Sequence, residues 1–272
     1  MSFDIDRLAA ILREAARAEA VSRFRRLDES MIKKKSEAID LVTEADIATE
    51  QVIKSQLTDW LPEALFVGEE SVAADPDLLA RLADADFAVV VDPIDGTANY
   101  AAGLPLFATM AAVVSGGETI AAIIYDPMGD DWMLAEKGGG AWQRQSDGRM
   151  VRLHVADPQP LDQMVGTASL AYMPKATRPQ ILQNTDKVRL VSNYRCAGHE
   201  YRTFVSGHSQ FLSYNKLMPW DHLAGSLLAQ EAGGYVARMD GLPYRPFHVD
   251  GGLLVAVDRD SWEVLRREVF TF

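Results

Sequence analysis

One apolar segment of this chain ends in two closely spaced carboxylates. Residues 87–91 (FAVVV) form a run that is too short for a helix and typical of a buried strand. The run continues into residues 92–97 (DPIDGT), so Asp92 and Asp95 follow the strand end three residues apart. Carboxylates and a free carbonyl in a tight turn are ligands that Mg²⁺ prefers, and Gly96 would let backbone amides approach an anion. This motif alone does not separate a metal site from an ordinary Asp-Pro-Gly turn.

Three other segments offer polar residues of the same kind. Glu69 follows a short apolar patch, residues 65–67, and is therefore also expected just beyond a strand. Asp221 begins a run with helical character, where it could be a helix cap and nothing more. Thr43 and Asp46 have the spacing of a capping box, which is a sufficient structural explanation for both. Each segment alone leaves its function open.

Together, the segments resemble the motifs of the inositol monophosphatase family, the Mg²⁺-dependent, lithium-sensitive phosphatases related to fructose-1,6-bisphosphatase. The matches occur in the family's order and at about its spacing, at residues 40–46 (DLVTEAD), 68–71 (GEES), 92–100 (DPIDGTANY) and 220–225 (WDHLAG). Four unrelated turns or caps would have to coincide to produce them by chance. The resemblance implies a five-layered αβαβα sandwich formed by one domain (1–272), with an α+β part at about 1–148 and an α/β part at about 149–272.

The resemblance also implies Mg²⁺-dependent hydrolysis of a small phosphate monoester, such as inositol monophosphate or a similar polyol phosphate, by a metal-activated water. Two to three ions are expected in the active site. The first would be held by Glu69, Asp92 and the backbone carbonyl of Ile94. The second would be held by Asp92, Asp95 and Asp221, and a third, weaker ion through Glu69 and waters. Li⁺ is expected to inhibit such a site.

The remaining site residues follow from the same resemblance. Thr97 and Asp46 would orient the attacking water on the Glu69 side and handle its proton. The Gly96 and Thr97 amides would cradle the phosphate. Lys35 matches a family lysine near the metal loop, or is an ordinary solvated lysine. The residues expected to contact the substrate are Asp95, Gly96, Thr97, Gly198, Glu200 and Asp221.

The substrate-recognition segment departs from the family pattern. Inositol-specific members place small residues after an Arg-x-x-Gly element and a glutamate several residues before the Trp-Asp pair. Here His199 and Glu200 follow Arg195-x-x-Gly198, and Tyr214 occupies the position of that glutamate. Glu200 could be a pocket carboxylate that repels a second anionic group, or could only begin a helix, as could His199. Arg195 could pair with Glu200 or reach a second phosphate itself.

Hydrophobic periodicity predicts the outline of both parts. In the first part, helices are expected at 5–24 and 44–61, and strands near 66 and at 88–91, 109–114 and 119–125. In the second part, strands at 164–169, 188–191, 210–214, 235–237 and 253–257 are expected to alternate with helices near 179–183, 198–205, 221–232 and 261–268. The triple glycine 138–140 lacks the Lys-Ser/Thr of a phosphate-binding loop and predicts a turn between strands. Residues 145–149 predict a hairpin turn or the join between the parts.

Composition indicates which binding partners and which cellular compartment suit the protein. A net charge of −12 argues against a surface that coats nucleic acid. The single cysteine, Cys196, excludes an internal disulfide, fits a reducing cytoplasm and is expected to be a buried, inert thiol. No segment approaches the roughly 20 apolar residues that span a bilayer, and residues 4–14 are too charged for a signal peptide. The sequence thus predicts a cytoplasmic protein with no nucleic-acid or membrane partner, and the resemblance adds a homodimer.

Two other functions remain as alternatives. One is hydrolysis of a different ester on the same fold, such as histidinol phosphate, fructose-1,6-bisphosphate or a 3′-phosphonucleotide. The other is a regulatory protein that keeps the fold and acts through a protein partner, as some bacterial members of the family do. The second is less well supported, because a protein without catalysis has no physical reason to retain carboxylates that repel one another in the absence of metal.

Overall fold

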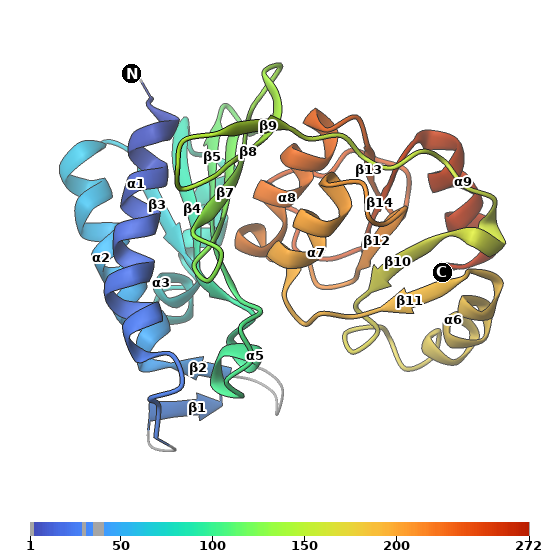
Figure 1. Cartoon of the computed structure of the whole chain (residues 1–272), viewed down its shortest axis with the longest axis horizontal. Coiled ribbons are helices and arrows are strands. Elements are labelled where there is room, and N and C mark those ends of the chain that lie inside the picture. The colour runs from blue at the N-terminus through green and yellow to red at the C-terminus, as the bar shows by residue number, and fades with distance from the viewer. Residues whose placement is uncertain (1–2, 29–30, 35–40, 272) are drawn as a thin grey trace.

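The computed structural model describes residues 3–28, 31–34 and 41–271, and its elements form five layers (Figure 1). They are a helical layer, a seven-stranded sheet, a second helical layer, a five-stranded sheet and an outer helical layer. This order confirms the predicted αβαβα sandwich. Lys35 and Asp40, which the sequence motifs include, lie outside the described residues. Within the described ranges, no helix combines the length and the apolar composition that crossing a bilayer requires.

Within the described residues, the first sheet contains seven strands in chain order, of which only β3 and β4 pair in parallel. The strands are β3 (Leu65–Gly68), β4 (Phe87–Asp95), β5 (Ala108–Ser115), β6 (Glu118–Asp126), β7 (Asp131–Glu136), β8 (Gly140–Arg144) and β9 (Met150–Arg152). Successive side chains of β4 point to opposite faces. Val89 and Val91 pack with α1 (Ile5–Ala15) and α2 (Glu44–Trp60), whereas Val90 packs with the helical layer between the two sheets. The uninterrupted apolar run is therefore explained by burial on both faces.

The second sheet has the strand order β11-β10-β12-β14-β13. Its strands are β10 (Val165–Ala168), β11 (Leu190–Ser192), β12 (Phe211–Tyr214), β13 (Tyr235–Arg238) and β14 (Leu253–Ala256). The helices beside it are α6 (Arg178–Asn184), α7 (Ala197–Val205), α8 (Pro219–Glu231) and α9 (Arg259–Glu268). Figure 1 shows α7 and α8 between the two sheets, with α6 and α9 on the outer side. The two middle helices approach closely because Gly225 has no side chain, and a Cβ there would lie 2.0 Å from the Tyr201 ring.

The structure contains short elements that periodicity does not predict. These are α3 (Glu69–Ala74), α4 (Asp77–Ala83), α5 (Thr97–Ala101), β7, β8, β9, two 3₁₀ turns (Leu161–Gln163 and Thr185–Lys187) and the hairpin of β1 (Ile32–Lys34) with β2 (Leu41–Thr43). One or two helical turns are too short to show a period of 3.6 residues. The predicted helix 5–24 is α-helical to Ala15 and continues as the π-helix Ala16–Val21. The triple glycine forms the β7–β8 turn and residues 145–149 form the β8–β9 turn, which confirms both predictions.

Candidate active site

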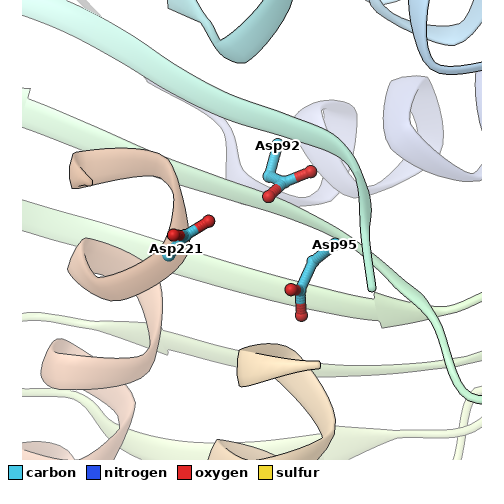
Figure 2. A group of neighbouring side chains, drawn as sticks. All are labelled: Asp92, Asp95 and Asp221. Atoms are coloured by element: carbon cyan, nitrogen blue, oxygen red, sulfur yellow. The ribbon is translucent and has the colours of Figure 1, made fainter. Parts of the chain in front are cut away.

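Three carboxylates from distant parts of the sequence meet where the first sheet faces α8. Asp92 and Asp95 lie near the end of β4, and Asp221 lies in the first turn of α8. One oxygen of each lies within 4.8 Å of the others, and Figure 2 shows the three side chains around a common space. Residues three apart on a regular strand point to opposite faces, but the pairing of β4 with β5 shifts register between Asp92 and Asp95. This irregularity lets both carboxylates face Asp221.

The electrostatics of the three carboxylates fit a cation site. Burial raises the pKa of Asp92 and of Asp221 well above the usual range and that of Asp95 to about 6, and the charge of Glu69 adds to each rise. Asp92 Oδ1 is buried and has no hydrogen-bond partner among the described residues. A buried anionic oxygen without a donor is unfavourable unless a cation or a proton is bound. An all-oxygen donor set fits a hard divalent ion such as Mg²⁺.

The carboxylates open onto a cavity of about 570 Å³. Glu69, in the first turn of α3, lines this cavity but lies outside the close group of three. Ile94, Gly96 and Thr97 line it from the end of β4 and the start of α5, and Glu200 lines it from α7. The tertiary structure therefore brings most of the predicted site residues to one cavity.

Glu50, which the sequence analysis missed, fixes the turn that carries Glu69. Its buried carboxylate accepts hydrogen bonds from the backbone amides of Glu70 and Ser71, both at 2.7 Å, and from Ser71 Oγ at 2.6 Å. These are amides of the first turn of α3, which have no acceptor within the helix. Gly68 is required beside them, because a Cβ there would lie 2.3 Å from Glu50 Cδ.

Replacing Glu50 with alanine should lower the free energy of unfolding by about 1–3 kcal/mol, because two partly buried amides lose their acceptor. The same change should raise the Mg²⁺ concentration that gives half-maximal activity, since Glu69 loses its fixed position. Glu50→Gln retains one acceptor oxygen and should therefore have smaller effects on the free energy of unfolding and on Mg²⁺ activation. Chemical denaturation and Mg²⁺ titration measure the two effects, with the exposed Glu63→Ala as control. Normal Mg²⁺ activation in a destabilised Glu50→Ala protein would show that Glu50 stabilises the fold but does not affect the metal site.

Thr97 connects the cavity to the buried Asp46. Its hydroxyl lies 3.0 Å from Asp46 Oδ1 and 3.0 Å from the carbonyl oxygen of Ile94. Asp46 Oδ2 accepts from the backbone amide of Thr43 at 2.8 Å, which completes the capping box of α2. Burial raises the pKa of Asp46 to about 6. Asp46 is therefore both a cap, as its spacing predicts, and an acceptor for the hydroxyl that lines the cavity.

Gly96 allows the chain to turn from β4 into α5. Its φ of 87° lies in the left-handed region, which residues with a Cβ rarely adopt. A Cβ at this position would also lie 3.0 Å from Cys196 Cβ and 3.0 Å from the carbonyl oxygen of Leu106. Both backbone conformation and packing therefore require glycine between the carboxylates and Thr97.

Asp95 also caps α7. Its Oδ1 accepts from the Ala197 amide at 3.2 Å, and its Oδ2 accepts from the Gly198 amide at 2.5 Å and from Cys196 Sγ at 3.0 Å. Gly198 does not line the cavity, and its amide is already directed at a carboxylate that faces the cavity. Cys196 is buried, as expected, and burial and Asp95 raise the pKa of its thiol well above the usual value, which disfavours the reactive thiolate.

Glu200 and His199 differ in their relation to the cavity. Glu200 is 2% exposed, lines the cavity beside Tyr214 and accepts from the backbone amide of Tyr194 at 2.9 Å. Burial raises the pKa of Glu200 to about 7. His199 instead contacts the carbonyl oxygen of Phe107 through Nε2 at 3.1 Å and does not line the cavity. His199 therefore fits the alternative in which it only begins a helix, whereas Glu200 lines the cavity and could contact a ligand.

The raised pKa of Glu200 predicts a pH-dependent stability. An acid whose pKa rises on folding from 4.5 to about 7 favours the folded state below about pH 4.5, and that contribution is lost as the pH rises to about 7. Glu200→Gln is neutral throughout, so the metal-free variant should exceed the wild type in unfolding free energy above pH 7 by on the order of 2–3 kcal/mol. Denaturation curves from pH 5 to pH 8 measure the difference. A difference that stays constant over this range would contradict the prediction.

The sequence analysis also missed two cavity residues, Tyr172 and Lys216. Glu50 could have been found from its position four residues after Asp46, which places both on one face of a helix. Tyr172 and Lys216 have no local signal, because they lie in loops that follow β10 and β12. Only the parallel pairing of these strands brings both loops to the same edge of the sheet.

Comparisons with known proteins agree with this geometry. A family model described as the inositol monophosphatase family matches residues 4–267. The inositol-1-monophosphatase of Caulobacter vibrioides is 33% identical over 233 residues, which cover 84% of this chain and 86% of that protein. The Nus factor SuhB of Escherichia coli is 31% identical over 206 residues, covering 74% of this chain and 73% of that protein. The extragenic suppressor protein suhB of Bartonella henselae shares the fold, with a TM-score of 0.81 over 98% of both chains at 24% identity. The chain therefore belongs to the inositol monophosphatase family and is a phosphoric monoester hydrolase.

Proposed function

We propose that this protein is a Mg²⁺-dependent phosphatase that hydrolyses a small polyol phosphate such as an inositol monophosphate. The observation that carries the proposal is the group of Asp92, Asp95 and Asp221. Asp92 and Asp95 are buried and Asp221 is half-buried, and the three repel one another and line a cavity of about 570 Å³. The name of the Caulobacter vibrioides relative supports inositol monophosphate as the first substrate to test.

Two sets of oxygens in this cavity suit Mg²⁺. Glu69, Asp92 and the Ile94 carbonyl would hold one ion, and Asp92, Asp95 and Asp221 a second, with a third bound more weakly through Glu69 and waters. Bound Mg²⁺ would neutralise the phosphoryl oxygens and make a water more acidic. Asp92 belongs to both sets, so its charge matters most.

The polar residues beside the carboxylates have distinct functions in this proposal. When the Thr97 hydroxyl donates a hydrogen bond to Asp46, its lone pairs remain free to accept a hydrogen bond from the attacking water. Glu69, which lines the cavity and whose charge acts on Asp46, would provide the second acceptor for that water. The amides of Gly96 and Thr97 would cradle the phosphate, and Glu200 would accept a hydrogen bond from a hydroxyl of the alcohol.

Phosphate release from a panel of esters tests the proposed function. The panel includes inositol 1-phosphate, glycerol 2-phosphate, histidinol phosphate, fructose-1,6-bisphosphate and adenosine 3′,5′-bisphosphate, each with Mg²⁺ and with excess EDTA. We expect hydrolysis of a polyol phosphate that EDTA abolishes and Mg²⁺ restores. EDTA-resistant hydrolysis would refute the metal dependence, and exclusive hydrolysis of histidinol phosphate or of the adenosine bisphosphate would refute the substrate class.

Li⁺ should inhibit the enzyme if the site formed by Asp95 and Asp221 is built as in the family. The expected pattern is uncompetitive with substrate, because Li⁺ would bind after the substrate and retain the phosphate product. Initial rates at several substrate and Li⁺ concentrations measure the pattern, with Na⁺ at equal ionic strength as control. Competition between Li⁺ and substrate would show that this part of the site binds cations differently.

A regulatory function is the second candidate, favoured by the 31% identity to a protein named a Nus factor. In this case the protein would act in the cytoplasm as a homodimer that binds a protein partner. A catalytically disabled Asp92→Asn protein separates the two functions. It would rescue a deletion strain if partner binding is sufficient, and would fail if hydrolysis is required.

A further inference from the structure

The cavity has residues in its wall that the proposed chemistry does not use. Tyr172, Arg195 and Lys216 line it, and each follows the carboxyl end of a different strand, β10, β11 or β12. β10 pairs in parallel with both β11 and β12, so the three strands end at the same edge of the sheet. Loops at the carboxyl ends of parallel strands are where α/β sheets bind ligands. The same cavity is lined by Asp92, Asp95 and Asp221.

Arg195 is held in a conformation that few side-chain-bearing residues adopt. Its φ is 55°, in the left-handed region. Its amide donates to Asn193 Oδ1 at 2.8 Å, and Asn193 Nδ2 donates to the Ala168 carbonyl at 3.0 Å. The neighbouring Tyr194 donates its amide to Glu200 and accepts from Asn99 Nδ2 at 2.7 Å. An unfavourable backbone conformation fixed from several sides is typical of a functional position.

Lys216 is placed by similar contacts. Its carbonyl oxygen lies 2.9 Å from His222 Nε2, on the helix that carries Asp221. Its ammonium lies 5.3 Å from the centre of the Tyr172 ring, within the range of a cation–π contact. Lys216 therefore remains at the cavity although its side chain is exposed.

The charges in the cavity wall are complementary to a substrate with two anionic groups. The three carboxylates would be neutralised by bound metal cations, and Glu200 is buried and bound to a backbone amide. Arg195 and Lys216 are exposed, and neither takes part in an ion pair within the described part of the chain, although the charge of Lys216 acts to lower the pKa of Asp221. Arginine and lysine at a cavity wall attract carboxylate or phosphate groups.

We propose that Arg195 and Lys216 form an anion subsite, which binds a carboxylate or second phosphate on the alcohol part of the substrate. This inference rests on the proposed phosphatase function. It replaces the expectation that Glu200 repels such a group, because one Glu200 oxygen already accepts from the Tyr194 amide and two basic residues line the same cavity.

Two pairs of esters that differ only in the second anion test the subsite. 2-Phosphoglycerate and glycerol 2-phosphate differ by a carboxylate, and fructose-1,6-bisphosphate and fructose 1-phosphate differ by a phosphate. We expect kcat/KM to favour the anionic member of at least one pair by about tenfold, and the preferred pair identifies the group. The preference should decrease as the salt concentration rises. Equal values within both pairs, or a preference for the neutral members, would overturn the subsite.

Variants test whether Arg195 and Lys216 cause the preference for the anionic ester. Arg195→Gln and Lys216→Gln should each reduce the kcat/KM ratio several-fold, and the double variant should bring it close to one. Arg259→Gln, on the outer helix α9 and outside the cavity, is the control and should retain the wild-type ratio. A preference that persists in the double variant would also overturn the proposal.

Affinity measurements test the anion subsite independently of the proposed phosphatase function. Calorimetric titration of each ester into the wild type and the double variant, with Ca²⁺ present as an oxygen-binding cation, needs no turnover. Tighter binding of the anionic ester by the wild type alone supports the subsite even if no ester is hydrolysed. Absence of hydrolysis refutes only the phosphatase proposal, whereas equal affinities in both proteins refute the subsite.

Discussion

Asp92→Asn should lower kcat by about a thousandfold or more while leaving the fold intact. Asp92 is the residue expected to contact two ions, so its neutralisation weakens both sites at once. The same change should raise the melting temperature of the metal-free protein, because the pKa of Asp92 is raised by burial and by three neighbouring carboxylates. A buried charge that destabilises the fold is retained only if something binds it. Activity and stability should therefore change in opposite directions.

Assays at saturating Mg²⁺ and thermal melts with EDTA measure the two effects of Asp92→Asn. Asp86→Asn is a matched control, because the same substitution is made at an exposed position just before β4. Near-normal turnover in a folded Asp92→Asn protein would refute the assignment of Asp92 to two ions. A lower melting temperature in EDTA would show that Asp92 serves the fold through contacts other than the metal.

Thr97→Ala should reduce kcat by about a hundredfold or more with little change in Mg²⁺ activation, because the hydroxyl is expected to orient water and not to hold the ion. Its hydroxyl contacts only Asp46 and the Ile94 carbonyl within the described residues, so the loss of stability should be small. Thr97→Ser retains the hydroxyl and should retain most of the activity. Failure of serine to rescue activity would indicate that the methyl group of Thr97 matters instead.

Asp46→Asn separates the two functions of this buried carboxylate. As a water-orienting partner of Thr97 it should lower kcat strongly, and as a cap of α2 it should lower the free energy of unfolding by about 1 kcal/mol. Both effects are expected, because the two carboxylate oxygens have different partners. A loss of stability with normal kcat would show that Asp46 acts only as a helix cap.

The sequence by itself determined the elements that depend on local chemistry. The strand before Asp92, the capping box of Thr43 and Asp46, and the glycine turn at Gly96 follow from short-range pattern and backbone preference. The order of the motifs was sufficient to identify the family and the layered fold. Short helices such as α3 could not be predicted, since six residues do not establish a period.

Tertiary structure alone decided how these elements meet. The register shift in β4 turns Asp92 and Asp95 to the same side, and the packing of α8 brings Asp221 to them from more than a hundred residues away. Glu50 fixes the turn before Glu69 through hydrogen bonds to backbone amides, which no sequence pattern records. Arg195 and Lys216 reach one cavity because their strands are aligned in parallel with β10. Such contacts depend on long-range packing, whereas sequence patterns report only the preferences of neighbouring residues.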